Sequence, residues 1–168
     1  MTTGLAALEL LVIDDNAQMR AIVGTVLAAA GVRRLRYAPD GRKGLEAVKQ
    51  GGIDVTFVDF EMPIMNGLEF LAALRSLTTP ERFMPVIMLT GHSDLKRITA
   101  ARDAGVNEFL GKPVTAKSIL TRLNTVITKP RPFVGAPRYF GPDRRRRTQE
   151  DYAGPLRRAS DDHAVLEL

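Results

Sequence analysis

The chain has 168 residues, of which 45% are hydrophobic and 26% are charged, and it contains no cysteine. This length accommodates one ordinary domain with an appendage but not two full domains. The lack of cysteine excludes disulfides and thiolate metal sites. Because the N-terminus has neither a basic start nor a long apolar run, we expect a cytoplasmic protein with no signal peptide and no membrane span.

The net charge of +5 is distributed unevenly along the chain. Residues 1–127 carry 15 basic and 13 acidic residues, whereas residues 128–149 carry seven basic residues against one acidic residue, Asp143. Residues 150–168 are acidic, with five acidic and two basic residues. The sequence therefore predicts a globular domain over residues 4–127 and a Pro- and Arg-rich extension over residues 128–168. A polyanionic partner is expected at the extension.

Short apolar runs alternate with amphipathic stretches along the first 127 residues, a pattern typical of βα units with a parallel sheet. Three of them, with the sequences LELLVI, VTFV and VIML, have the pattern expected of central parallel strands that are buried on both faces. The candidate strands are Leu8–Ile13, Val32–Tyr37, Ile53–Val58, Pro85–Leu89 and Val106–Leu110.

Each stretch between or after these strands begins with a residue suited to cap a helix. The expected N-caps are Asn16, Asp40 or Gly41, Asn66, Ser93 and Thr115. This alternation predicts a doubly wound (βα)5 fold, whose ligand site lies beyond the carboxyl ends of the strands. Five of the ten prolines fall after residue 128, so we expect an irregular C-terminal tail rather than a continuous helix.

Polar side chains follow four of the predicted strands. Asp14 and Asp15 follow the first strand, Asp59 follows the third, Thr90 the fourth and Lys112 the fifth. Three carboxylates gathered at one edge would repel one another unless a cation lay between them, and oxygen ligands suit Mg²⁺ or Mn²⁺. We therefore predict a metal site formed by the three aspartates.

The same edge suits phosphoryl transfer. A carboxylate can attack phosphorus and form an acyl phosphate, and Asp59 at the end of a buried strand is the candidate nucleophile. The ammonium group of Lys112 can pair with phosphoryl oxygens, and the hydroxyl of Thr90 can donate a hydrogen bond to one of them.

The motifs VIDDN, VDFEMPIMNG, MLTGH and FLGKPV resemble those of CheY-like response regulator receiver domains over about 125 residues. The resemblance implies a flavodoxin-like fold and a phosphoacceptor signalling protein rather than an enzyme. It implies that Asp14 and Asp15 bind Mg²⁺ and that Asp59 is phosphorylated by a histidine kinase or phosphotransfer protein. Thr90 would then sense the phosphoryl group and Lys112 would pair with it.

The resemblance also assigns roles to residues near the fifth strand. Phe109 resembles the family's rotameric switch, and Lys112-Pro113 resembles its cis peptide. The surface formed by the fourth helix, fifth strand and fifth helix would change shape on phosphorylation. Glu61, two residues after Asp59, is expected to influence the lifetime of the phosphoryl group, and His92 is expected to be an exposed loop residue.

The tail is shorter than a usual DNA-binding output module, so no specific DNA binding is expected. Its run Arg144–Arg147 follows Tyr139 and Asp143. Arginine grips phosphates and reads guanine O6 and N7, and a carboxylate accepts hydrogen bonds from guanine N1 and N2. This combination favours a guanine nucleotide as ligand.

The segment RYFGPDRRRR resembles the arginine-rich stretch of a subfamily of CheY-like cyclic di-GMP effectors. The resemblance implies a ligand site within about residues 136–148, and docking on a protein target such as the flagellar motor switch. The implied ligand-binding residues are Arg138, Tyr139, Asp143, Arg144, Arg145, Arg146 and Arg147.

Other interpretations of the tail remain open. The arginine run could be a solvated charge cluster, or it could bind nucleic acid or anionic lipid without sequence specificity. A different class of function is a phosphorelay shuttle that needs Asp59 but has a disordered tail and binds no nucleotide.

Overall fold

The computed structural model describes residues 4–91 and 95–144 and the backbone of residues 164–166. Its core is a parallel five-stranded sheet with the strand order β2-β1-β3-β4-β5, so the predicted (βα)5 fold is confirmed. All five strands begin one or two residues later than predicted. They are β1 (Glu9–Ile13), β2 (Arg34–Ala38), β3 (Val55–Asp59), β4 (Val86–Thr90) and β5 (Glu108–Gly111).

Five α-helices connect or follow these strands, and a short 3-10 helix precedes β4. The helices are α1 (Ala17–Ala29), α2 (Gly41–Lys49), α3 (Gly67–Arg75), η1 (Pro80–Phe83), α4 (Leu95–Asp103) and α5 (Ala116–Thr128). The side chains of four predicted N-caps accept a backbone N–H of the first turn, namely Asn16, Asp40, Asn66 and Thr115. These local predictions are confirmed, whereas Ser93 lies outside the described residues.

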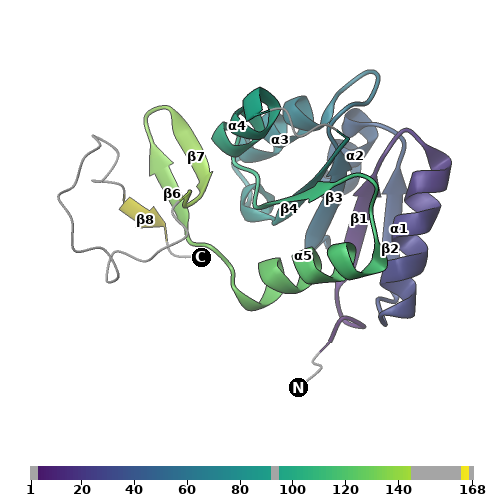
Figure 1. The fold of residues 1–168 in the computed structure, drawn as a ribbon. Helices are drawn as coiled ribbons and strands as arrows, with labels where there is room; N and C mark the ends of the chain where they lie inside the picture. The colour runs from purple at the N-terminus through teal and green to yellow at the C-terminus, as the bar shows by residue number, and fades with distance from the viewer. Residues whose placement is uncertain (1–3, 92–94, 145–163, 167–168) are drawn as a thin grey trace.

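The sheet is covered on both faces (Figure 1). Alternate residues of a strand point to opposite faces, so Leu10 and Val12 of β1 pack with α1 and α5, while Leu11 and Ile13 pack with α2, α3 and α4. Each fully buried aliphatic side chain contributes about 1.5–3 kcal/mol relative to exposure. Burial on both faces holds the strand ends at fixed positions, and with them the polar residues that follow.

Within the extension that the sequence predicts as irregular, the structure adds an antiparallel hairpin. Strands β6 (Phe133–Ala136) and β7 (Tyr139–Pro142) are joined by Pro137 and Arg138, and the backbone of β8 (Ala164–Leu166) pairs with the other edge of β6. We call β6 and β7 with their turn the hairpin; it follows α5 and is light green in Figure 1. Among the described residues, no helix is long and apolar enough to cross a membrane.

Candidate functional site

Three aspartates meet at the carboxyl edge of the sheet. Asp14 and Asp15 follow β1 and Asp59 ends β3, and one carboxylate oxygen of each lies within 4.8 Å of the others. Asp14 and Asp59 are buried, whereas Asp15 is exposed. The cluster is therefore buried at Asp14 and Asp59 and open to solvent at Asp15.

The environment of Asp14 fits a bound cation. Its Oδ1 accepts a hydrogen bond from the backbone N–H of Asn16 at 2.8 Å. Its Oδ2 is buried and accepts no hydrogen bond from any described residue, and it lies 3.6 Å from Nζ of Lys112. A buried carboxylate oxygen without a donor is costly, and a hard cation such as Mg²⁺ is the partner that three clustered carboxylates favour.

Lys112 brings a positive charge to the cluster. Its Nζ lies 2.9 Å from Oδ1 of Asp59, and its backbone N–H donates to the carbonyl of Thr90 at 2.8 Å, which ties the end of β5 to the end of β4. The peptide bond between Lys112 and Pro113 is cis, as the resemblance implied.

The charges at this edge shift two pKa values. Burial raises the pKa of Asp59, the hydrogen bond from Lys112 opposes this rise, and the neighbouring charge of Asp14 adds to it. Burial tends to lower the pKa of Lys112, but its hydrogen bond and ion pair with Asp59 outweigh this effect and raise the pKa. Lys112 therefore stays charged at neutral pH, while Asp59 holds a proton more readily than an ordinary aspartate.

Two further predicted residues lie on the strands beside this cluster. Thr90 ends β4, is buried, and pairs in register with Gly111 of β5. Phe109 is partly buried and packs against the core on the α2, α3 and α4 face. It also lines a surface groove together with residues of α5.

The loop after β3 contacts two helices. Gly67 begins α3 so close to β3 that a Cβ at this position would lie 2.4 Å from the carbonyl oxygen of Asp59. Glu61 forms an ion pair with Arg97 of α4, and the Arg97 guanidinium lies 5.3 Å from the ring centroid of Phe60. The candidate phosphoacceptor is thereby linked to α4 through its own loop.

Comparison with known proteins agrees with this geometry. Residues 10–124 match the response regulator receiver domain family. Chemotaxis protein CheY-3 of Vibrio cholerae is 31% identical over 122 residues, which cover 73% of this chain and 93% of that protein. The chain belongs to the receiver family. The solved structure of V. cholerae CheY4 is 30% identical and covers 72% of this chain and 99% of that chain, with a TM-score of 0.67.

A more distant structure has the same fold. The CheX-CheY-BeF3-Mg²⁺ complex of Borrelia burgdorferi matches at 22% identity and a TM-score of 0.67, covering 73% of this chain and 90% of that chain. This chain is thus a CheY-like response regulator of two-component signalling. Receiver domains bind Mg²⁺ in an acidic pocket, and the aspartate cluster has the geometry to hold such an ion. The family match ends at residue 124, before the extension.

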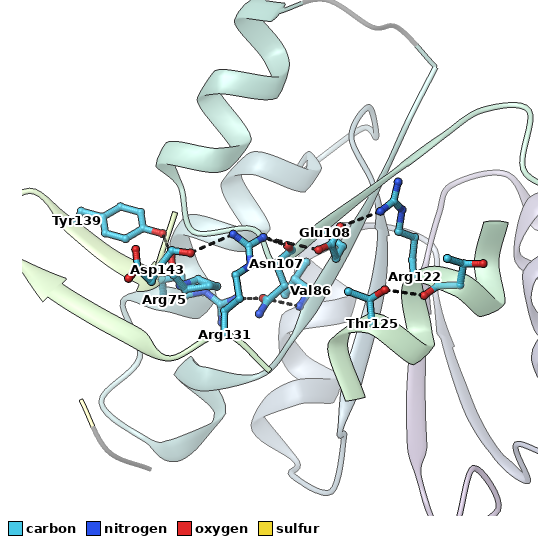
Figure 2. A network of polar contacts seen from close by, with 11 residues as sticks. Arg75, Val86, Asn107, Glu108, Arg122, Thr125, Arg131, Tyr139 and Asp143 are labelled. Carbon is cyan, nitrogen blue, oxygen red and sulfur yellow. Dashed lines mark hydrogen bonds and ion pairs between the residues drawn. The ribbon is translucent and has the colours of Figure 1, made fainter. Parts of the chain in front are cut away.

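The hairpin is docked on the amino edge of the receiver sheet, and Arg75 is central to this contact (Figure 2). Arg75 ends α3 and is only 4% exposed. Burial lowers its pKa to about 9, so it remains a cation at neutral pH. Its guanidinium lies 4.9 Å from the ring centroid of Phe133. It donates hydrogen bonds to the carbonyls of Gly105, Arg82 and Met84 and to Oδ1 of Asn107.

Arg131 provides a second link between the hairpin and the sheet (Figure 2). It donates to the carbonyl of Asp143 at 3.0 Å and to the carbonyl of Asn107. It also lies 3.8 Å from Glu108, which forms a second ion pair with Arg122 of α5 at 3.2 Å. The hairpin is therefore connected to both β5 and α5.

Apolar contacts complete the docking. The rings of Phe83, Phe133 and Phe140 lie 5.3–5.6 Å apart, two of the pairs edge to face, an arrangement worth about 0.5–1.5 kcal/mol per pair beyond burial. Gly141 and Gly105 pack backbone to backbone, since a Cβ on Gly141 would lie 2.7 Å from Cα of Gly105.

The structure locates four of the seven tail residues implied by the resemblance. Arg138 is exposed in the hairpin turn. Tyr139 is partly buried, its hydroxyl donates to the carbonyl of Pro142 at 2.6 Å, and burial raises its pKa. Asp143 follows the hairpin, and its backbone N–H donates to the carbonyl of Pro132.

Arg144 contacts both the hairpin and the receiver domain. Its guanidinium lies 4.5 Å from the ring centroid of Tyr139 and forms an ion pair with Asp103 of α4 at 2.6 Å. The remaining implied ligand residues, Arg145, Arg146 and Arg147, lie outside the described residues, as does His92.

Sequence reasoning missed the residues that hold the hairpin. These are Arg75, Arg82, Asn107, Glu108 and Arg131. A signal was present, because two four-residue segments rich in apolar and aromatic residues, FVGA and YFGP, are separated by two residues, the spacing of a tight hairpin.

Proposed function

We propose that this chain is a response regulator that is phosphorylated on Asp59, with Mg²⁺ held by Asp14, Asp15 and Asp59. The observation that carries the proposal is the convergence of three carboxylates and one lysine at the carboxyl edge. The chemotaxis relative and the CheY complex with BeF3 and Mg²⁺ support the same assignment.

In the proposed reaction an oxygen of the Asp59 carboxylate attacks the phosphorus of a phosphohistidine on a histidine kinase or phosphotransfer protein. The new P–O bond forms as the P–N bond breaks, and the departing imidazole takes up a proton. Lys112 holds a positive charge 2.9 Å from Asp59, where it can pair with the phosphoryl oxygens. Bound magnesium would neutralise charge on those oxygens, and the Thr90 hydroxyl would donate a hydrogen bond to one of them.

Phosphorylation of Asp59 is tested with a small phosphodonor such as acetyl phosphate and Mg²⁺. We expect the wild type to incorporate phosphate and Asp59→Asn to give only background incorporation, measured by phosphate-affinity electrophoresis. Glu46→Gln is the control, because Glu46 is exposed and pairs only with Lys43 among the described residues. Incorporation by Asp59→Asn at the wild-type level would overturn the assignment.

We further propose that the tail binds cyclic di-GMP and that binding controls docking on a protein target such as the flagellar motor switch. Seven basic residues within residues 128–149 support an anionic ligand. The hairpin supports a shaped site, since Arg144 is stacked on Tyr139 and is held against α4 by Asp103. The helix that Arg144 contacts, α4, belongs to the surface expected to respond to phosphorylation.

Calorimetric titration of cyclic di-GMP into the full chain tests this second proposal. We expect saturable binding to wild type that Arg145→Ala weakens by about tenfold or more, while Asp59→Asn still binds. No detectable heat at high micromolar ligand would end the proposal. That result would favour the phosphorelay shuttle, which requires Asp59 but tolerates alanine at Arg144–Arg147. Ligand binding that depends strongly on salt and shows little preference for guanine would instead indicate a nucleic-acid site.

A further inference from the structure

Four arginine side chains surround the docked hairpin, and three of them are already engaged. Arg75 and Arg131 donate hydrogen bonds to carbonyl oxygens of the receiver domain. Arg144 pairs with a carboxylate of α4. Arg82 differs from these three, because its side chain forms no hydrogen bond and no ion pair with any described residue.

Arg82 is nevertheless held in one position. It lies on η1, and its guanidinium carbon is 3.6 Å from the ring centroid of Phe140. Its Nε is buried and has no acceptor within the described part of the chain, although the residue as a whole is partly exposed. A buried N–H donor without an acceptor carries a free-energy cost, which an anion bound by this guanidinium would offset.

The surroundings of Arg82 favour such a ligand. Burial lowers the pKa of Arg75, and repulsion from the nearby charge of Arg82 lowers it further. No described carboxylate pairs with Arg82. A guanidinium can pair through its N–H edge with phosphate or with guanine O6 and N7. Both chemistries occur together in a guanine nucleotide.

Arg82 also touches the segment implied in nucleotide binding. Phe140 lies in the hairpin, next to Tyr139 and within the stretch from Arg138 to Arg147. Arg75 packs on Phe133, and Arg131 donates to the carbonyls of Asn107 and Asp143, so the docked hairpin places Phe140 against Arg82.

We propose that Arg82 is a ligand-binding residue of the cyclic di-GMP site, which is therefore built jointly by the receiver domain and the tail. This inference rests on the proposed binding of cyclic di-GMP. Arg82 is outside the arginine run and some 60 residues before it in sequence, so the ligand would bridge two parts of the chain and couple the tail to the receiver domain directly.

The test is a calorimetric titration of cyclic di-GMP into the full chain carrying Arg82→Met. Methionine keeps an extended apolar side chain against Phe140 but removes the charge and all N–H donors. We expect the dissociation constant to rise by about tenfold or more. Arg33→Met is the matched control, because Arg33 is exposed and forms no hydrogen bond or ion pair with a described residue, and we expect it to bind like wild type.

The outcomes separate this inference from the proposed function. Binding by Arg82→Met within twofold of wild type overturns the role of Arg82 and leaves the proposed function standing, whereas no binding by wild type ends both. Amide hydrogen exchange of the hairpin reports whether Arg82→Met has loosened it. If the hairpin is loosened in Arg82→Met, the Arg82→Lys variant decides, because lysine keeps the charge but lacks the planar guanidinium. Binding at least about threefold weaker than wild type supports the proposal. Binding equal to wild type overturns it.

Discussion

The two edges of the receiver sheet carry opposite chemistry. At the carboxyl edge, Asp14, Asp15 and Asp59 form a cluster, the ammonium group of Lys112 pairs with Asp59 and Asp14, and a buried carboxylate oxygen has no donor among the described residues. At the amino edge, arginines from α3, η1 and the linker after α5 surround the hairpin, and the guanidinium of Arg82 has no described acceptor. One edge is thus suited to a cation and the other to an anion.

Strand β5 runs from the network at the amino edge to Lys112 at the carboxyl edge. The residues just before and at the start of β5, Asn107 and Glu108, contact Arg75 and Arg131 at the amino edge. Lys112 follows the other end of the strand, and Phe109 lies between. Residues at both edges thus contact the ends of the same four-residue strand, and the following predictions test how differently the edges behave.

The largest effect is expected at the amino edge from Arg75→Met. The substitution removes the guanidinium that donates to the carbonyls of Gly105, Arg82 and Met84 and to Oδ1 of Asn107, so we expect the free energy of unfolding to fall by about 3 kcal/mol. Urea unfolding measures the loss. Arg33→Met makes the same chemical change at an exposed position and should stay within about 0.5 kcal/mol of wild type. A loss below about 1 kcal/mol for Arg75→Met would show that the network contributes little.

A pair of glycine substitutions isolates the contact between hairpin and sheet. Gly31 and Gly105 both have positive φ, at 104° and 93°, so alanine at either position costs about 1 kcal/mol in backbone strain. A Cβ at Gly31 meets nothing within 4 Å, whereas one at Gly105 would lie 2.9 Å from the carbonyl oxygen of Phe140. We expect Gly105→Ala to destabilise by an additional 1–2 kcal/mol or so, with faster amide exchange in β6. Equal losses would contradict tight docking.

At the carboxyl edge the prediction concerns pH and metal. The pKa of Asp59 is raised in the folded state above its ordinary value of 3.8. Without metal, the ionised form of Asp59 therefore destabilises the fold at neutral pH. This penalty is lost as the pH falls through the raised pKa toward 3.8. In EDTA, Asp59→Asn should therefore be more stable than wild type at pH 7 by roughly 1 kcal/mol, with the difference shrinking on acidification.

Magnesium provides the control for that comparison. Because Mg²⁺ binds the folded state, it should stabilise wild type, and Asp59→Asn, which lacks one carboxylate, should gain less. Thermal unfolding with and without Mg²⁺ at several pH values measures both effects. A wild type that is more stable than Asp59→Asn in EDTA at pH 7 would refute the assigned sign.

The smallest effect is expected from Asp103→Asn, which removes the ion pair with Arg144. The two side chains are 50% and 39% exposed, so solvent screens the pair and we expect a loss of less than about 1 kcal/mol that vanishes at high salt. Urea unfolding at low and high salt measures it. A larger loss that resists salt would indicate that this contact, rather than Arg75, anchors the end of the hairpin.

Local signals in the sequence identified most of the receiver domain and its candidate site. Asn16, Asn66 and Thr115 cap their helices through their own side chains, which depends on a few neighbouring residues. The positions of Asp14 and Asp59 after apolar runs were sufficient to predict that they meet, because parallel strands bring their carboxyl ends to one edge. The roles of these residues in catalysis and metal binding remain proposals.

Only the tertiary structure revealed the amino edge. In the sequence, nothing distinguishes Arg75 from an ordinary arginine at the end of a helix. Its burial depends on hydrogen-bond acceptors of Gly105 and Asn107, which lie about 30 residues later in the chain. The strands of the hairpin contain proline and glycine, which weaken every local strand signal, and the hairpin gains its support from rings and arginines of the receiver domain. Short-range capping and strand alternation are encoded within a few residues, whereas this docking depends on partners that meet only after the chain has folded.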